Sequence, residues 1–151
     1  MGEYLRLARV YLVLLAIFTV ARWLTGTFGV PYDRGHHVFS LVTLTVFGAL
    51  FYGAFARRWL GYRLAQAAVL GYVLGMAAQI VIVLATAISY GAGLDTYFTN
   101  PRALNVEGPL PFGDAMIRRL GGLIVNPLSA ALIGCIGWAL GALLPETPRS
   151  E

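Results

Sequence analysis

Residues 64–94 read LAQAAVLGYVLGMAAQIVIVLATAISYGAGL, and none of these 31 residues carries a charge. A helix needs about 20 mostly apolar residues to cross some 30 Å of bilayer hydrocarbon. The stretch is therefore long enough to span a membrane, and it sets the solvent in which the rest of the chain must fold.

The composition of the whole chain agrees with this first stretch. Apolar residues make up 58% of the 151 residues and charged residues 12%, whereas an ordinary soluble domain has about 25% charged residues. A soluble fold of this length has too little interior to hide so much apolar surface. The balance excludes an intrinsically disordered chain and indicates an integral membrane protein.

Two further charge-free stretches, residues 35–56 and 120–145, are also long enough to span. The first apolar stretch, residues 10–21, is shorter, and it spans only if Arg9 and Arg22 carry their charged heads to the two interfaces. We predict an all-α, polytopic integral membrane protein folded as a four-transmembrane-helix bundle. Its single membrane domain covers residues 1–151, with spans at about 5–28, 36–56, 64–90 and 116–144.

The predicted connections differ in length. Residues 57–63 form a short turn, whereas residues 91–115 contain Pro101, Pro109 and Pro111 together with several glycines, which forbids a continuous helix. The aromatic and apolar residues of this long loop predict an ordered flap. Asp114 is the expected N-cap of the fourth span.

The basic residues set the expected orientation. The chain has a formal net charge of +4, but its eleven basic residues form no single run, so no nucleic-acid partner is expected. Arg57, Arg58 and Arg63 cluster between the second and third spans, and such clusters stay in the cytoplasm. Together with Arg149 they place both termini in the cytoplasm, with a bacterial inner (cytoplasmic) membrane as the expected location.

Two helical faces are rich in small residues, which let helix backbones approach closely in lipid. Gly71, Gly75 and Gln79 share one face of the third span, and Gly134, Gly137 and Gly141 form a stripe on the fourth. These helix-packing faces can hold helices together within one chain, or they can join copies of the chain or a larger complex.

The fourth span also contains Asn126 and Pro127. A proline inside a helix removes one hydrogen bond, and the neighbouring amide makes this a candidate kink or pore-lining position. No Asp, Glu or His lies near the middle of any predicted span, and a proton-coupled carrier needs such a titratable group. A proton antiporter is therefore disfavoured.

The predicted outer face gathers the remaining polar side chains. Asp33, His36 and His37 are weak metal candidates, because adjacent residues on a helix point about 100° apart and no third histidine exists. Neither a metal nor another cofactor is expected. The surplus of arginines favours an anionic ligand or lipid headgroup, although the same residues could merely anchor helix ends; these are Arg22, Arg34, Arg118 and Arg119.

No residue is assigned a catalytic role, because the single cysteine, Cys135, has no candidate general base in its membrane layer. The sequence favours a non-catalytic subunit that assembles through its glycine-rich faces into a homo-oligomer or a membrane complex, with the lipid bilayer as its other partner. The alternatives are an oligomeric pore or facilitator for a small solute or anion, and a membrane enzyme or lipid-binding protein that uses the outer polar cluster.

The predicted topology can be tested by cysteine labelling in a Cys135→Ser background. Because the Arg57–Arg63 cluster is costly to translocate, Ser150→Cys should react with an impermeant reagent only from the cytoplasmic side, and Thr99→Cys only from the outer side. Labelling of Ser150→Cys from outside alone would reverse the orientation.

Overall fold

The computed structural model describes residues 2–145, and helices account for 78% of it; these residues contain no strand. Arg149 and Ser150, used above for the orientation, lie outside the described residues. The elements are α1 (Gly2–Leu7), α2 (Arg9–Thr27), α3 (Tyr32–Gly35), α4 (Leu41–Leu60), α5 (Leu64–Gly91), the 3-10 helix η1 (Pro101–Leu104), α6 (Phe112–Leu140) and the 3-10 helix η2 (Gly141–Leu143).

Three helical segments of the described chain are long and apolar enough to cross a membrane. They are α2, α5 and the segment Phe112–Leu143, which consists of α6 and η2. The helix α4 is not among them. Its last turn carries Arg57 and Arg58, and every 18-residue window of this 20-residue helix contains both, which lowers its mean hydropathy. The protein is thus all-helical, with three helices suited to a bilayer.

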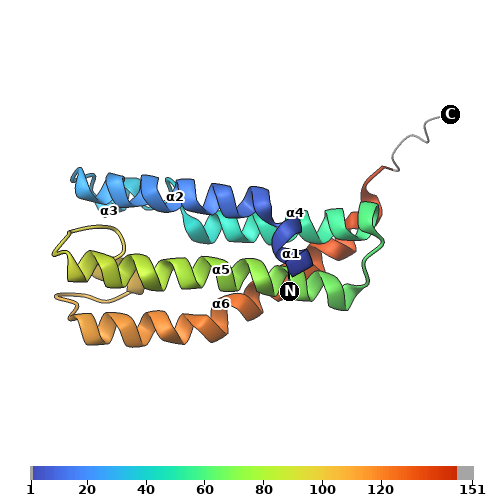
Figure 1. Cartoon of the computed structure of the whole chain (residues 1–151). Coiled ribbons are helices and arrows are strands. Elements are labelled where there is room, and N and C mark those ends of the chain that lie inside the picture. Colours follow the sequence, from blue (N-terminus) through green and yellow to red (C-terminus); the bar gives the residue numbers. More distant parts are fainter. Residues whose placement is uncertain (1, 146–151) are drawn as a thin grey trace.

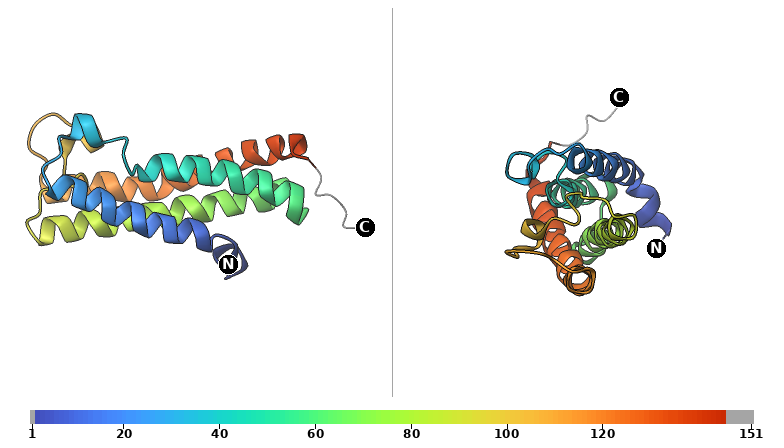
Figure 2. Two further views of the ribbon diagram at one scale, coloured as in Figure 1. Left: turned by 90° about the horizontal axis from the view of Figure 1, so that it is seen from above. Right: turned by 90° about the vertical axis from the view of Figure 1, so that its left-hand side faces the viewer.

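The four long helices, α2, α4, α5 and α6, lie side by side (Figure 1). The helices α5 and α6 run the full length of the molecule. The helices α2 and α4 are staggered along it, so α2 flanks the end that carries residues 92–111 and α4 flanks the other end (Figures 1 and 2). We call the first of these the loop end and the second the turn end.

The closest helix contact joins α5 to α6 through glycine. A Cβ atom added to Gly71 would collide with the backbone of Ala130, and one added to Gly75 would lie 2.7 Å from Ala130 Cβ and 2.8 Å from Pro127 Cα. On the opposing helix, a Cβ atom on Gly134 would come within 2.9 Å of the Ala67 carbonyl. These positions therefore accept no larger side chain without moving a helix.

The glycine stripe on α6 also packs against α4. A Cβ atom on Gly137 would collide with the carbonyl of Leu50, and one on Gly141 would lie 2.7 Å from the Ala54 carbonyl. The glycine faces singled out in the sequence are thus used within one chain. Assembly of copies or of a larger complex stays a prediction, and these glycines are already occupied by intramolecular packing.

The helix α2 is fixed to its neighbours by one buried tyrosine. The hydroxyl of Tyr11 is 2.9 Å from Thr45 Oγ1 of α4 and donates to the Leu74 carbonyl of α5 at 3.1 Å. A polar group buried at membrane depth needs such partners. Three helices are therefore joined at this level, where α2 and α4 overlap.

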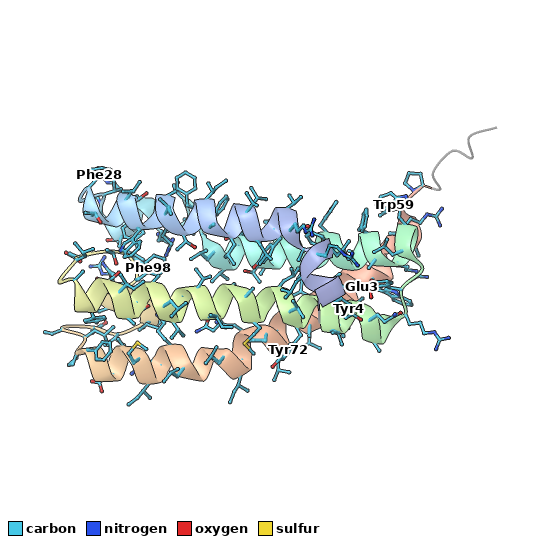
Figure 3. All side chains as sticks on the ribbon, in the orientation of Figure 1. Glu3, Tyr4, Phe28, Trp59, Tyr72 and Phe98 are labelled. Atoms are coloured by element: carbon cyan, nitrogen blue, oxygen red, sulfur yellow. The ribbon has the colours of Figure 1, made fainter. Side chains whose placement is uncertain are left out.

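Basic side chains close the turn end. Arg57 donates to the Trp138 carbonyl at 3.3 Å and its guanidinium lies 4.1 Å from the centre of a Trp138 ring. The Trp138 indole in turn donates to the Tyr62 carbonyl at 2.7 Å. A cation at the last carbonyls of a helix offsets their partial negative charge. Glu3 and Tyr4 of α1 lie toward the same end (Figure 3), where Glu3 accepts from the Tyr62 hydroxyl at 2.9 Å.

The predicted boundaries of the first two spans are wrong by several residues. The first span is divided at Ala8 into α1 and α2. The second begins at Leu41 rather than residue 36, because Phe39 takes a left-handed conformation with φ 51° and Ser40 then caps the helix by accepting from the Thr43 amide at 3.3 Å. It continues to Leu60, where Gly61 ends it with φ 65°.

The prediction for Asp114 is also wrong. Pro111 is the N-cap of α6, and Asp114 is the third residue of the helix. Because proline has no amide hydrogen and a fixed φ, the chain turns into the helix directly after Pro111. An acidic residue in the first turn still interacts favourably with the positive end of the helix.

The glycine contacts predict opposite effects for two glycine-to-alanine substitutions. Gly75→Ala should lower the free energy of unfolding by about 1–3 kcal/mol, because the new methyl group overpacks the α5–α6 contact. Gly121→Ala is the matched control, since a Cβ atom there meets nothing within 4 Å, and it should be neutral or stabilise α6 by up to about 1 kcal/mol. Thermal unfolding in detergent measures both; equal midpoints would contradict the packing described here.

Candidate anionic-ligand site

A pocket of about 180 Å³ lies at the loop end of the bundle. Five parts of the chain form it: α2, the segment from α3 to the start of α4, α5, the loop between α5 and α6, and α6. Its lining residues are Arg22, Tyr32, His36, His37, Ser40, Leu41, Val42, Ile82, Tyr97, Phe98, Ala103 and Arg119.

Arg22 comes from α2 and points inward. That its charged head lies at the membrane interface stays a prediction. The side chain is half-buried, and its Nη1 donates to the carbonyl of His36 at 3.0 Å. The guanidinium also lies 5.2 Å from the centre of the Tyr97 ring. The carbonyl of His36 follows the short helix α3, and Arg22 supplies the donor that it lacks there.

Arg119 comes from α6 and is also half-buried. Its Nη2 donates to the carbonyl of Phe98 at 3.2 Å, so it holds the loop down on the bundle. Its Nε is buried and has no hydrogen-bond partner among residues 2–145. Since a guanidinium carries five donor hydrogens, Arg119 keeps binding capacity that the described residues do not use.

No carboxylate is among the described residues that line this pocket. The nearest acidic residue in sequence, Asp33, is exposed and accepts a hydrogen bond from Arg102 instead. That bond lowers the pKa of the Asp33 carboxyl and raises the pKa of Arg102. Two arginines therefore share one half-buried pocket without a counter-ion, which is costly unless an anion completes it.

The roof of the pocket is the loop that the sequence predicted as an ordered flap. Phe98 is 2% exposed and points between α2 and α5, whereas Phe28 points away from the bundle (Figure 3). The Tyr97 hydroxyl donates to the Val30 carbonyl at 2.9 Å, and burial raises the pKa of Tyr97. Close backbone contact with Gly26, where an added Cβ atom would lie 2.6 Å from the Tyr97 amide nitrogen, brings the loop onto α2.

The floor of the pocket is the N-terminus of α4. Ser40, Leu41 and Val42 line it, and Ser40 caps the Thr43 amide. The first amides of a helix lack intrahelical partners and carry partial positive charge. The floor therefore has the same electrostatic sign as the two arginines.

Of the other nominated polar residues, His36 and His37 line the pocket beside the arginine pair, and Asp33 does not. Arg34 and Arg118 are exposed and do not line it. His36 and His37 have ring centres 3.7 Å apart, and His36 Nδ1 is 3.1 Å from the Tyr32 carbonyl. Residues 2–145 contain no group of three His, Cys, Asp or Glu that could hold a metal ion, because Asp33 points to Arg102 rather than to the histidines.

The two amide residues Gln79 of α5 and Asn126 of α6 bond to each other, and Asn126 is exposed. Gln79 is 2% exposed; its Nε2 donates to the Arg119 carbonyl, and its Oε1 accepts from Asn126 Nδ2 at 2.6 Å. Pro127 lies inside α6 beside this pair, and α6 changes direction near its middle (Figure 1). The kink is thus supported by a side-chain bridge to α5.

The sequence nominated both arginines of the pocket but missed its aromatic walls, Tyr32, Tyr97 and Phe98. Their only signal was the aromatic content of segments that are otherwise rich in glycine and proline. A scan against protein-family models gave no match, and neither a curated protein nor a solved structure showed significant similarity to the chain.

The Asp33–Arg102 pair predicts a specific change in titration. Arg102→Gln should raise the pKa of the Asp33 carboxyl toward its ordinary value of 3.8, because the neutral side chain no longer favours the carboxylate. The contribution of the pair to stability is present at neutral pH and disappears as the pH falls through the lowered pKa of Asp33. An NMR titration of the Asp33 carboxyl carbon measures the shift, with Arg34→Gln as the control; a pKa unaffected by Arg102→Gln would refute the pairing.

Proposed function

We propose that this protein is a non-catalytic membrane protein that binds an anionic group, a phosphate or a carboxylate, in the pocket between Arg22 and Arg119. The observation that carries the proposal is the meeting of two half-buried arginines in a pocket whose described lining contains no carboxylate. The guanidinium of Arg119 supports it, because the bond from its Nη2 to the Phe98 carbonyl uses one of five donor hydrogens.

The proposed setting is a bacterial inner membrane crossed by four helices, with both termini in the cytoplasm. The helix α4 is the second span and adds to the other three, because 20 residues at 1.5 Å per residue cover about 30 Å. Arg57 and Arg58 lie in its last turn, where long basic side chains reach the interface. This orientation puts the arginine pocket near the outer headgroup layer.

A binding role is favoured over catalysis by the chemistry of the pocket. Its polar groups are mainly donors, and His36 Nδ1 is within hydrogen-bond distance of the Tyr32 carbonyl. Donors of fixed geometry suit the recognition of an anion. Such a protein could work alone or as a subunit of a homo-oligomer or larger membrane complex, and the pocket requires neither arrangement.

Binding should be measured on the purified full-length protein by native mass spectrometry with dioleoyl phosphatidylglycerol, dioleoyl phosphatidylcholine and the water-soluble headgroup analogue glycerol 1-phosphate. Arg22→Gln and Arg119→Gln should each weaken binding of the anionic probes by about tenfold or more, because each removes a charge-assisted hydrogen bond. Arg118→Gln is the matched control, since it removes an exposed arginine from the adjacent position of the same helix.

The variant Arg119→Lys separates the effect on anion binding from the effect on folding. Arg119→Lys keeps a cation that can still donate to the Phe98 carbonyl but loses the planar fork, so thermal stability should change little while anion binding falls. Binding of both anionic probes that survives Arg22→Gln, Arg119→Gln and their combination would overturn the proposal. Binding of phosphatidylglycerol alone identifies a lipid headgroup as the source of the anion, and equal binding of glycerol 1-phosphate identifies a soluble one.

A further inference from the structure

The pocket lined by Arg22 and Arg119 is called here the arginine pocket. A second hollow lies next to it, nearer the middle of the bundle, on the side between α4 and α6. It has a volume of about 80 Å³, and α5 forms its base with small residues, Gly75 and Ala78. Val42 and Val46 of α4 form one wall, and Ala130 and Ile133 of α6 form the other. We call this hollow the side groove.

The side groove opens toward the lipid. Val42 is 63% exposed, and Ser129, which also lines the groove, is exposed on α6. In a bilayer these positions face hydrocarbon under the proposed four-span arrangement. Most of its lining is apolar, which suits hydrocarbon rather than water.

The side groove and the arginine pocket are adjacent. Leu41, Val42 and Ile82 line both hollows, so they meet at the N-terminus of α4. The pocket lies nearer the loop end and the groove nearer the middle of the bundle. Arg119 and Asn126, which mark the two levels on α6, are seven residues apart, or about 10 Å along the helix.

The arginine pocket and the side groove follow one another in the same order as the two parts of a membrane lipid. A membrane lipid carries its charged headgroup at the interface and its hydrocarbon chain toward the bilayer centre, which is the order of the arginine pocket and the side groove. A soluble anion would occupy the arginine pocket alone. The charge of the pocket and the apolar groove adjacent to it therefore favour an anionic lipid over a free phosphate or carboxylate.

We infer that the two hollows form a single binding site for an anionic membrane lipid, whose headgroup lies between Arg22 and Arg119 and one of whose chains lies in the side groove. The inference rests on the proposed function and deepens it by naming the ligand class. It differs from ordinary lipid contact because occupancy of the groove depends on the headgroup.

The test uses the full-length protein in nanodiscs that contain a photoreactive lipid with a diazirine in one acyl chain. Two such probes are compared, a phosphatidylglycerol and a phosphatidylcholine, and the crosslinked peptides are mapped by mass spectrometry. The phosphatidylglycerol probe should crosslink residues 42–46 and 129–133 at least about fivefold more than the phosphatidylcholine probe does. Arg119→Gln should remove this difference, and Arg118→Gln should preserve it.

Groove-filling variants provide the second measurement. Val46→Trp and Ser129→Trp place a large side chain at the groove, and both should lower crosslinking there and weaken binding of phosphatidylglycerol. The matched controls are Phe47→Trp and Leu132→Trp on the same helices, at positions that are 65% and 67% exposed and do not line the groove. Both controls should bind like the unsubstituted protein.

The outcomes distinguish the two proposals. If Arg119→Gln abolishes phosphatidylglycerol binding but the groove crosslinks equally to both probes, the anion site stands and the single-lipid site is refuted. If the arginine substitutions leave binding of both anionic probes unchanged, the proposed function fails as well. If Ser129→Trp changes only the oligomeric state, the groove is a contact between copies and the inference is wrong.

Discussion

The close approach of α5 and α6 is the constraint on which the rest of the structure depends. In lipid there is little hydrophobic drive for helices to associate, so contact comes from van der Waals packing between backbones. Gly71 and Gly75 give α6 access to the α5 backbone, and the stripe on α6 then has Gly137 and Gly141 left for α4. The two longest helices form a frame against which α2 and α4 pack at different heights.

The stagger of α2 and α4 creates the candidate site. Because α4 starts only at Leu41 and α2 lies toward the loop end, α2 flanks α5 and α6 at the loop end and α4 flanks them at the turn end (Figures 1 and 2). At the loop end, the space between the N-terminus of α4 and the end of the bundle is filled by the short helix α3 and by the loop that carries Tyr97 and Phe98. Arg22 and Arg119 each donate to a carbonyl of these irregular segments, so the same residues close the end of the bundle and line the pocket.

Much of the fold follows from the sequence, and the site follows only in part. Long charge-free stretches predict α5 closely and locate α6 within a few residues, because length and hydropathy are properties of a single segment. The start of α4 depends on the left-handed conformation of Phe39, which no local pattern announces. The direction of Arg22 depends on a carbonyl 14 residues away, and a tertiary contact of this kind has no signature in helical periodicity. Four arginines were nominated for one face, but only the three-dimensional arrangement separates the two that meet from the two that face outward.

The roof made by Tyr97 and Phe98 restricts the routes into the pocket. Phe98 is almost fully buried, and Tyr97 is tied to the Val30 carbonyl, so the aqueous side is covered by ordered protein. Under the proposed lipid site, the side groove gives a second approach, from within the plane of the bilayer. A ligand that enters by that route never leaves the lipid phase. Its occupancy would then follow its mole fraction among neighbouring lipids rather than any concentration in water, and its exchange rate would be limited by lateral diffusion and by the passage of one chain between α4 and α6.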